Sequence, residues 1–89
     1  MRAVITVIGK DMVGILAKVS NECANNNINV LEVTQSILQD MFAMIMMVDI
    51  SKSTVDFTDF ADSLSKMGEE MNLSIHAMHE DIFNAMHTI

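Results

Sequence analysis

The 89-residue sequence contains no proline, tryptophan or tyrosine and a single cysteine, Cys23. One cysteine excludes an internal disulfide and any metal site built from cysteines alone. A lone free thiol is also more typical of a reducing compartment than of a secreted scaffold held by disulfides. We therefore expect a cytoplasmic protein whose fold is held by its core alone.

Basic residues are scarce as well: five lysines and arginines stand against twelve acidic residues, which gives a net charge of −7. Such a charge repels nucleic-acid phosphates and anionic membrane surfaces. The longest apolar run lies within residues 41–48, far short of the roughly 20 residues that span a bilayer. The N-terminal residues do not have the pattern of a signal peptide. We expect neither nucleic acid nor a membrane as a partner.

Apolar side chains are abundant, at 51% of the residues against 19% charged ones. That balance excludes disorder and predicts a well-filled core. A chain of 89 residues can build one such core but not two. Residues 1–89 are therefore expected to form a single domain.

Four segments have the composition of β-strands. Residues 3–8 (AVITVI) are almost wholly apolar and rich in β-branched side chains, whereas residues 29–39 alternate between apolar and polar positions, as a half-buried strand does. Residues 41–50 are apolar at both parities through Val48, which predicts a central strand covered on both faces. Residues 73–79 supply the fourth strand.

Two helices separate these strands. Apolar residues recur at helical spacing from Met12 to Cys23, and three asparagines at 25–27 end the first helix, because asparagine tolerates the left-handed conformation. Asp56 begins the second helix in a D-x-x-D pattern that resembles a capping box, and an apolar stripe follows it. Residues 81–89 form a short amphipathic tail.

The order βαββαβ predicts an α+β, ferredoxin-like fold: a four-stranded antiparallel sheet with two helices on one face, followed by a short C-terminal helix. Right-handed crossovers place the first and third strands in the middle of the sheet. The face away from the helices then needs cover, which the tail or a second copy of the chain can supply, so we expect a homo-oligomer, at least a dimer. A partly apolar open face is the alternative. The residues expected to need this cover are Val4, Ile8, Phe42, Met44, Met46 and Val48.

The end of the first strand is the strongest candidate for a binding site. Residues 9–16 run from a strand into a helix and present backbone N–H groups at the positive end of the helix dipole, where a carboxylate can bind. The same pattern fits a structural role, in which Gly14 lets the first helical turn pack close to the sheet and Asp11 caps the helix. The spacing alone leaves both interpretations open.

A family resemblance favours a binding site. Residues 9–16 (GKDMVGIL), followed by Asn29 and Val30 at the start of the next strand, resemble the ACT domain, and residues 82–89 are similar to the ending of small stand-alone ACT proteins of the UPF0237 type. The resemblance implies a regulatory module of amino-acid metabolism, not an enzyme, that binds a small molecule, usually an amino acid, where two domains pair. It also implies a partner enzyme or regulator and no cofactor. The ligand-binding positions that it implies are Asp11, Met12, Val13, Gly14, Ile15, Asn29 and Val30.

Three positions bear on the identity of the ligand. Val13 stands where many family members have proline. Gly9 and Asp11 stand where the serine-binding members have histidine and asparagine, so the resemblance does not name the ligand. Asp11 suits an ammonium group, whereas the helix start suits a carboxylate. Together they favour a zwitterion.

Other residue patterns point to structural roles. His76 and His79 are three apart on a strand and point to opposite faces, so they cannot chelate one metal. Cys23 lies in the apolar stripe of its helix and is expected to be a small buried residue. The acidic residues within 56–62 lack the spacing of a calcium loop and are expected to form a solvated helix start.

Other proteins with this topology fit less well. An RNA-recognition motif needs aromatic and basic residues on its third strand, and residues 41–50 supply one phenylalanine and no cation. Acylphosphatase-like enzymes hold phosphate with an arginine in a loop, whereas Arg2, the single arginine, stands at the start of the first strand. The functions that remain are a ligand-sensing regulatory module, as the alternative a purely structural dimerisation module without a ligand, and an enzyme that the sequence does not reveal.

Overall fold

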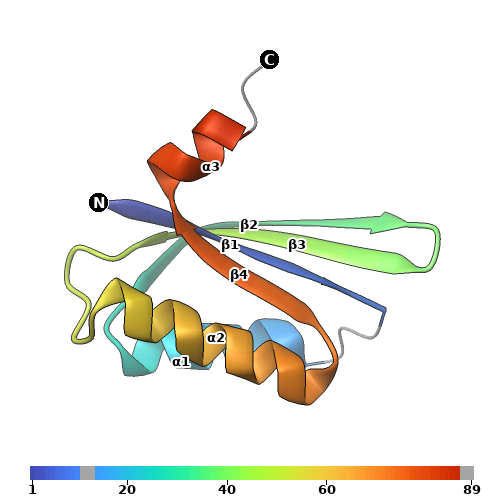
Figure 1. Ribbon diagram of the computed structural model, residues 1–89, viewed down its shortest axis with the longest axis horizontal. Coiled ribbons are helices and arrows are strands. Elements are labelled where there is room, and N and C mark those ends of the chain that lie inside the picture. The colour runs from blue at the N-terminus through green and yellow to red at the C-terminus, as the bar shows by residue number, and fades with distance from the viewer. Residues whose placement is uncertain (11–13, 87–89) are drawn as a thin grey trace.

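The chain folds in the predicted order βαββαβ, and a short helix follows the last strand (Figure 1). The computed structural model describes residues 1–10 and 14–86. The predicted ferredoxin-like α+β fold is confirmed. The elements are β1 (Arg2–Gly9), α1 (Ile15–Asn25), β2 (Asn29–Leu38), β3 (Met41–Asp49), α2 (Phe57–Met71), β4 (Ser74–His79) and α3 (Glu80–Met86).

Four antiparallel strands form one sheet in the order β2-β3-β1-β4. β1 and β3 are the central strands, as the handedness of the crossovers predicts. Figure 1 shows α1 and α2 together on one side of the sheet and α3 on the other side. The two faces of the sheet therefore have different neighbours.

The core fills the space between the sheet and the two long helices. Ile5 and Met46 of the central strands are fully buried there, together with Val19 of α1 and Phe60 and Leu64 of α2. The helices contribute these residues at a spacing of three or four positions, which keeps them on one side of each helix. The core therefore lies on one face of the sheet.

The strand register corrects the prediction of which β3 side chains face away from the helices. The four β3 residues expected on that face lie instead on the helix side: Phe42 packs against the core, and Met44, Met46 and Val48 are fully buried in it. Of the six residues expected on the other face, Val4 and Ile8 of β1 lie there.

β3 is also not covered on both faces by its own chain. Ile45, which has the opposite parity to Met44 and Met46, is 41% exposed. The prediction of a doubly covered strand is therefore wrong for the single chain. Apolar residues at both parities identify a central strand, but they do not reveal which parity the helices cover, because pairing with neighbouring strands decides that.

Asparagine residues follow both long helices in the left-handed conformation: Asn27 has φ 58° and Asn72 has φ 61°. The predicted end of α1 is therefore confirmed. The capping box predicted at Asp56 is wrong, because within the described residues its side chain makes no capping hydrogen bond to α2. A capping box uses Glu or Gln at the third helical position, and Asp59 is one methylene shorter.

Candidate functional site

Gly14 is the residue that leads into α1. Its backbone is left-handed, with φ 76° and ψ −2°, and its carbonyl accepts a hydrogen bond from the Lys18 N–H at 3.1 Å. Gly14 is exposed, and no atom of residues 1–10 or 14–86 outside its chain neighbours lies within 4 Å of the place that a Cβ would take. Glycine is therefore needed here for its backbone angle and not for close packing against the sheet.

The start of α1 offers backbone donors to a ligand. Ile15 anchors the helix in the core, where it is 2% exposed. The described first turn, 15–17, contains no acidic residue, so its N–H groups keep the partial positive charge of a helix start. Lys10 lies at the same end of the sheet, with its Nζ 3.8 Å from the Asp40 carboxylate. Asp40 offsets the charge of Lys10, so the backbone N–H groups of the helix start are the feature that favours an anionic group.

Three of the predicted site residues, Asp11, Met12 and Val13, lie outside the described residues. Their assignment to ligand binding stays a prediction. Of the predicted loop positions, Gly14 and Ile15 are the ones whose geometry the structure describes.

Asn29 and Val30 begin β2, beyond the other end of α1. Asn29 is exposed and pairs with Asp49 of β3, whose neighbour on the far side is Arg2 of β1. Val30 is half-buried and packs against the core. Asn29 lines a pocket of about 460 Å³ together with Asp49, Lys52 and the end of α1. Asn29 therefore lines a pocket, whereas Val30 packs against the core, and the assignment of both to ligand binding stays a prediction.

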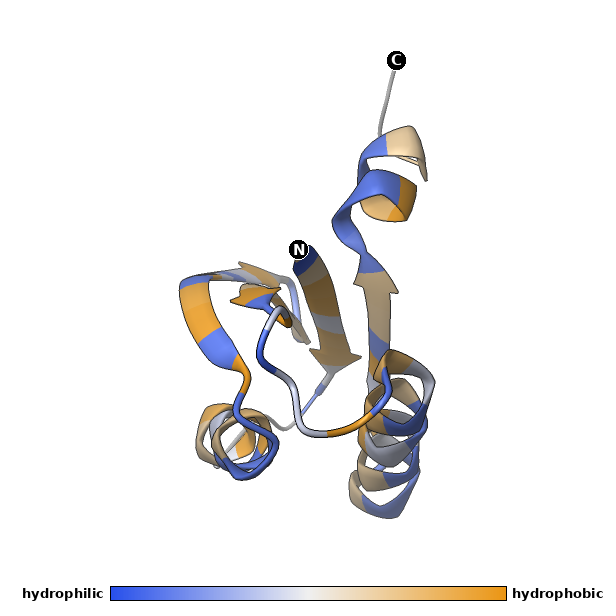
Figure 2. Cartoon of the chain, turned by 90° about the vertical axis from the view of Figure 1, so that its left-hand side faces the viewer, coloured by the Kyte–Doolittle hydropathy of each residue, from blue (hydrophilic) through white to orange (hydrophobic). Residues whose placement is uncertain are grey.

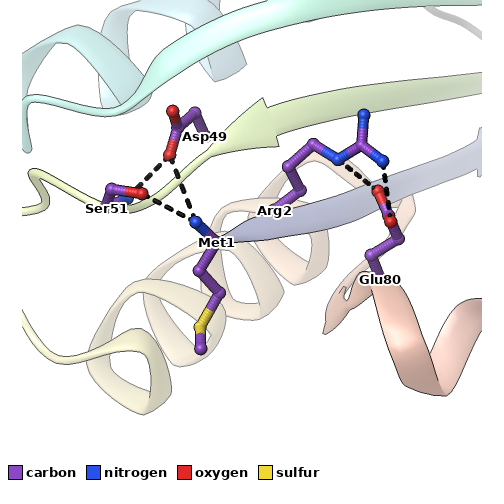
Figure 3. A network of polar contacts seen from close by, with 5 residues as sticks. All are labelled: Met1, Arg2, Asp49, Ser51 and Glu80. Atoms are coloured by element: carbon purple, nitrogen blue, oxygen red, sulfur yellow. Dashed lines mark hydrogen bonds and ion pairs between the residues drawn. The ribbon is translucent and has the colours of Figure 1, made fainter.

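Polar contacts hold Asp49, one of the residues that line this pocket (Figure 3). The Met1 ammonium donates to Ser51 Oγ at 2.7 Å and lies 3.8 Å from Asp49 Oδ1, and the Ser51 N–H donates to the same carboxylate oxygen at 2.9 Å. Hydrogen bonds from Ser51, followed by the positive charges of Met1 and Lys52, lower the pKa of Asp49 below its ordinary value of 3.8. Asp49 is therefore ionised at neutral pH.

The pocket presents an anion, a cation and an amide, from Asp49, Lys52 and Asn29. An amide both donates and accepts hydrogen bonds, and the two charges complement the two ends of a zwitterion. Sequence reasoning missed Asp49 and Lys52, because they follow Asn29 by 20 and 23 positions. The signal that joins them is the pairing of β2 with β3, which sets Asp49 opposite Asn29.

The two halves of the predicted site lie far apart in a single chain. Gly14 is at the start of α1, and Asn29 follows its end. A helix of 11 residues is about 16 Å long, more than the length of a small amino acid. The sheet gives the same separation, since Gly9 pairs with Phe42 at one end of β3 and Asn29 pairs with Asp49 at the other.

The remaining reactive side chains have structural surroundings. Burial, with a smaller contribution from Glu22, raises the pKa of Cys23 to about 11, which agrees with its predicted role as a small buried residue. His76 is exposed on the edge strand β4, and the His79 ring lies against Phe57 with 4.3 Å between the ring centroids. Within the part of the chain that the structure describes, no three His, Cys, Asp or Glu side chains are grouped as a metal site.

Residues 2–78 match the sequence profile of the ACT domain family. The chain belongs to the ACT domain family. A UPF0237 protein of Listeria innocua is 52% identical to this ACT protein over 89 residues, which cover the whole of both chains. The predicted membership of the UPF0237 type is therefore confirmed.

Solved structures agree with this assignment. An ACT domain protein from Streptococcus pneumoniae matches with a TM-score of 0.80 and 35% identity, and the match covers 93% of each chain. The regulatory subunit of aspartate kinase from Thermus thermophilus shares the fold, with a TM-score of 0.62 at 24% identity over 85% of this chain and 49% of that one. Among the described residues of this ACT protein, no helix has the length and apolarity to cross a membrane.

Proposed function

We propose that this ACT protein is a cytoplasmic regulatory module, not an enzyme, that binds an amino acid between two copies of the chain and regulates amino-acid metabolism through a partner enzyme or regulator. The observation that carries the proposal is the separation of Gly14 from Asn29 by the length of α1. The region at each end of α1 has groups that suit one part of a zwitterion. A complete site therefore needs one end from each copy.

A two-fold pairing of β2 edges would bring the two ends together. β2 is an edge strand, and its side chains are exposed throughout 31–37. In an antiparallel pair, the start of one strand lies beside the end of the other. Asn29 of one copy would then lie at the end of the sheet that carries Gly14 of the other copy. An uncovered edge strand favours such pairing, because its backbone groups on that side have no strand to bond.

The charges at such a junction complement an amino acid. Backbone N–H groups at the start of α1, near Gly14 and Ile15, would hold the carboxylate. Asp11, whose role is predicted from the sequence, would accept a hydrogen bond from the ammonium group, and the Asn29 amide would bond to either end of the ligand. The ionised Asp49 supplies a second acceptor on the Asn29 side.

Two further observations support this function. The fold is shared with the regulatory subunit of aspartate kinase from Thermus thermophilus, which favours a regulatory role over a catalytic one. The single cysteine, Cys23, is free and buried, which is typical of proteins in a reducing compartment such as the cytoplasm.

Thermal shift with the twenty amino acids, followed by calorimetry, tests the proposal. At least one amino acid should raise the melting temperature in proportion to its concentration, because it binds the folded state. Asn29→Ala and Asp11→Asn should then lower the affinity at least tenfold, about 1.4 kcal/mol, with little change in the melting temperature of the free protein. Asn21→Ala, an exposed asparagine on α1, is the matched control and should bind as the wild type does.

The alternative function, a dimerisation module without a ligand, gives a different outcome. It predicts a dimer whose melting temperature none of the twenty amino acids changes and whose calorimetric titrations release no heat of binding. That result would contradict ligand sensing and leave the structural role.

A further inference from the structure

One face of the sheet carries little charge, is apolar at half of its positions and is only partly covered. We call it the open face. It consists of Val4, Thr6 and Ile8 of β1, which point away from α1 and α2, and of the residues that lie beside these three on the other strands of the sheet. Ile8 and Ile45 are 46% and 41% exposed on this face, whereas Val4, near the end of β1 that meets α3, is fully buried. The twelve residues of the open face are Val4, Thr6, Ile8, Glu32, Thr34, Ser36, Ala43, Ile45, Met47, Ser74, His76 and Met78.

The charge of the chain favours a second copy as the partner that covers this face. The chain has a net charge of −7, so two copies repel each other except where their surfaces carry little charge. Among the twelve described positions of the open face, Glu32 on the edge strand is the one acidic residue, and none is lysine or arginine. A basic partner would instead favour the exposed acidic residues of α2, such as Asp59, Asp62 and Glu69.

α3 also needs a surface on which to pack. None of its seven described residues is buried, and Ile82 and Met86 are 52% and 65% exposed. Figure 2 shows α3 standing out from the sheet on the side away from α1 and α2. Its own chain holds it through the Arg2–Glu80 ion pair and contacts with β1 and β4. A helix of one to two turns is not stable by itself in water, so its apolar side chains favour a further contact.

We propose that a second copy of the chain packs on the open face, with α3 of each copy lying over the Ile8 and Ile45 half of the other. The chain's own α3 lies at the Val4 half, so one helix from each copy fills the space between the two sheets. Four strands about 4.8 Å apart and eight residues of about 3.3 Å each give a face of roughly 500 Å². The chain's own α3 covers the Val4 half, so about half of this face and the exposed side of α3 enter the contact, which makes it smaller than the roughly 800 Å² per partner of a standard interface.

This interface goes beyond the proposed ligand site and is separate from it. Gly14 and α1 lie on the opposite side of the sheet, and the pairing of β2 edges uses backbone groups rather than the open face. Copies that use both contacts form a tetramer where the two two-fold axes cross at right angles. Ligand affinity therefore reports on the edge contact, whereas the face contact is read from the mass of the assembly.

Sedimentation of the full chain with Ile45→Glu tests the proposal, because the new carboxylate would be buried without a partner between the two sheets. We expect the mass of the assembly to fall by half and its dissociation constant to rise at least a hundredfold. Val55→Glu is the matched control: Val55 is 37% exposed in the loop before α2, away from the open face, and its variant should keep the wild-type mass. A monomeric wild type, or Ile45→Glu with the wild-type mass, would overturn the proposal.

A second variant and a spin label keep the test decisive if Ile45→Glu fails to fold. Ile82→Glu changes an exposed residue of α3 and should split the assembly in the same way; an unchanged mass would overturn the role of α3.

In a mixture of ¹⁵N-labelled wild type and unlabelled Met86→Cys carrying a nitroxide, the backbone signals of Ile8 and Ile45 should broaden, since they report contacts between copies. Unbroadened signals at both residues would contradict the proposed packing. Cys23 does not compete for the label, because its thiol is buried.

Discussion

Arg2 and Glu80 join the first strand of the sheet to the last helix. Arg2 Nε lies 2.6 Å from Glu80 Oε2, and the second contact, from Arg2 Nη2 to Glu80 Oε1, is 2.8 Å long. The second contact is a hydrogen bond that Arg2 donates, and the first is an ion pair, so the two side chains meet at two points. The Glu80 side chain is 20% exposed, so this pair is better shielded from water than the Met1–Asp49 and Lys10–Asp40 ion pairs. It holds α3 on the side of the sheet opposite α1 and α2.

Arg2→Met should therefore loosen α3 without unfolding the sheet. A pair at the surface stabilises by up to about 1 kcal/mol, which is enough to accelerate amide exchange within 80–86 and to lower the melting temperature slightly. Hydrogen exchange followed by mass spectrometry measures this. Lys10→Met removes an ion pair whose side chains are each 75% exposed and should leave exchange in α3 unchanged. Equal exchange in both variants would show that Arg2 does not hold the helix.

Gly14→Ala should lower the free energy of unfolding by about 1–2 kcal/mol, because a Cβ disfavours the left-handed backbone that Gly14 adopts at φ 76°. Gly14→Asn should lose less, since asparagine tolerates this conformation. The space around Gly14 is open among the described residues, so neither change adds a steric clash. Urea denaturation measures both variants, and two variants as stable as the wild type would contradict a left-handed Gly14 in solution.

Gly68→Ala should destabilise the fold, although the same change on an exposed helix stabilises by about 1 kcal/mol. The new Cβ would lie 2.8 Å from the Leu73 carbonyl oxygen and 3.0 Å from Ile75 Cγ1, so α2 must move away from β4. We expect a net loss of roughly 1–3 kcal/mol in urea denaturation. Glu70→Ala, at an exposed position of the same helix, is the control and should change stability little. A stabilised Gly68→Ala would show that α2 and β4 are not in close contact.

Asp49 should account for part of the loss of folding stability at acidic pH. Its pKa is lowered from 3.8, chiefly by hydrogen bonds from Ser51, so the folded chain binds this proton less readily than the unfolded chain does. The contribution to stability is therefore complete above a pH of about 4 and is lost as the pH falls through the lowered pKa. Asp49→Asn should flatten the acid side of a plot of stability against pH. Asp40→Asn, at a side chain that is 75% exposed, serves as the control, and an equal flattening there would contradict a special role for Asp49.

The element order could be predicted because periodicity, turn residues and crossover handedness can all be judged from the sequence. The face of the sheet on which each β3 side chain lies could not be predicted. Residues 41–48 are apolar at both parities, and the pairing of Ile5 with Met46 places Met46 rather than Ile45 in the core. Parity follows from contacts between residues that are distant in the sequence, which a local pattern does not contain.

The part of the candidate site that lies within one stretch of the sequence could be predicted. Gly14 is recognisable because a glycine between a strand and a helix is typical of a turn with a left-handed backbone. Asp49 and Lys52 could not be recognised, because they reach Asn29 through a pairing of β2 with β3 whose register shifts between Val30 and Glu32. A shift of one residue exchanges the faces of a strand, so counting along the sequence does not locate such neighbours.

Two defective variants should restore each other's binding if the ligand site is shared between copies. Asn29→Ala removes the amide of one half, and Gly14→Asn places a side chain at the other half while keeping the left-handed backbone. In each homodimer, both sites contain one defect. After subunit exchange in an equal mixture, half of the dimers are mixed, and in each of these one site contains both defects and the other contains none. Calorimetry should then find high-affinity sites at about one quarter of the wild-type number.

The control for this experiment is a chain that carries both substitutions. Mixed with Asn29→Ala, it gives no intact site under any arrangement, so the mixture should bind no better than Asn29→Ala alone. If Gly14 and Asn29 served one ligand within the same chain, every site in the first mixture would also contain a defect, and no high-affinity binding would return. Recovery in the first mixture but not in the second therefore requires that each ligand contacts two copies of the chain.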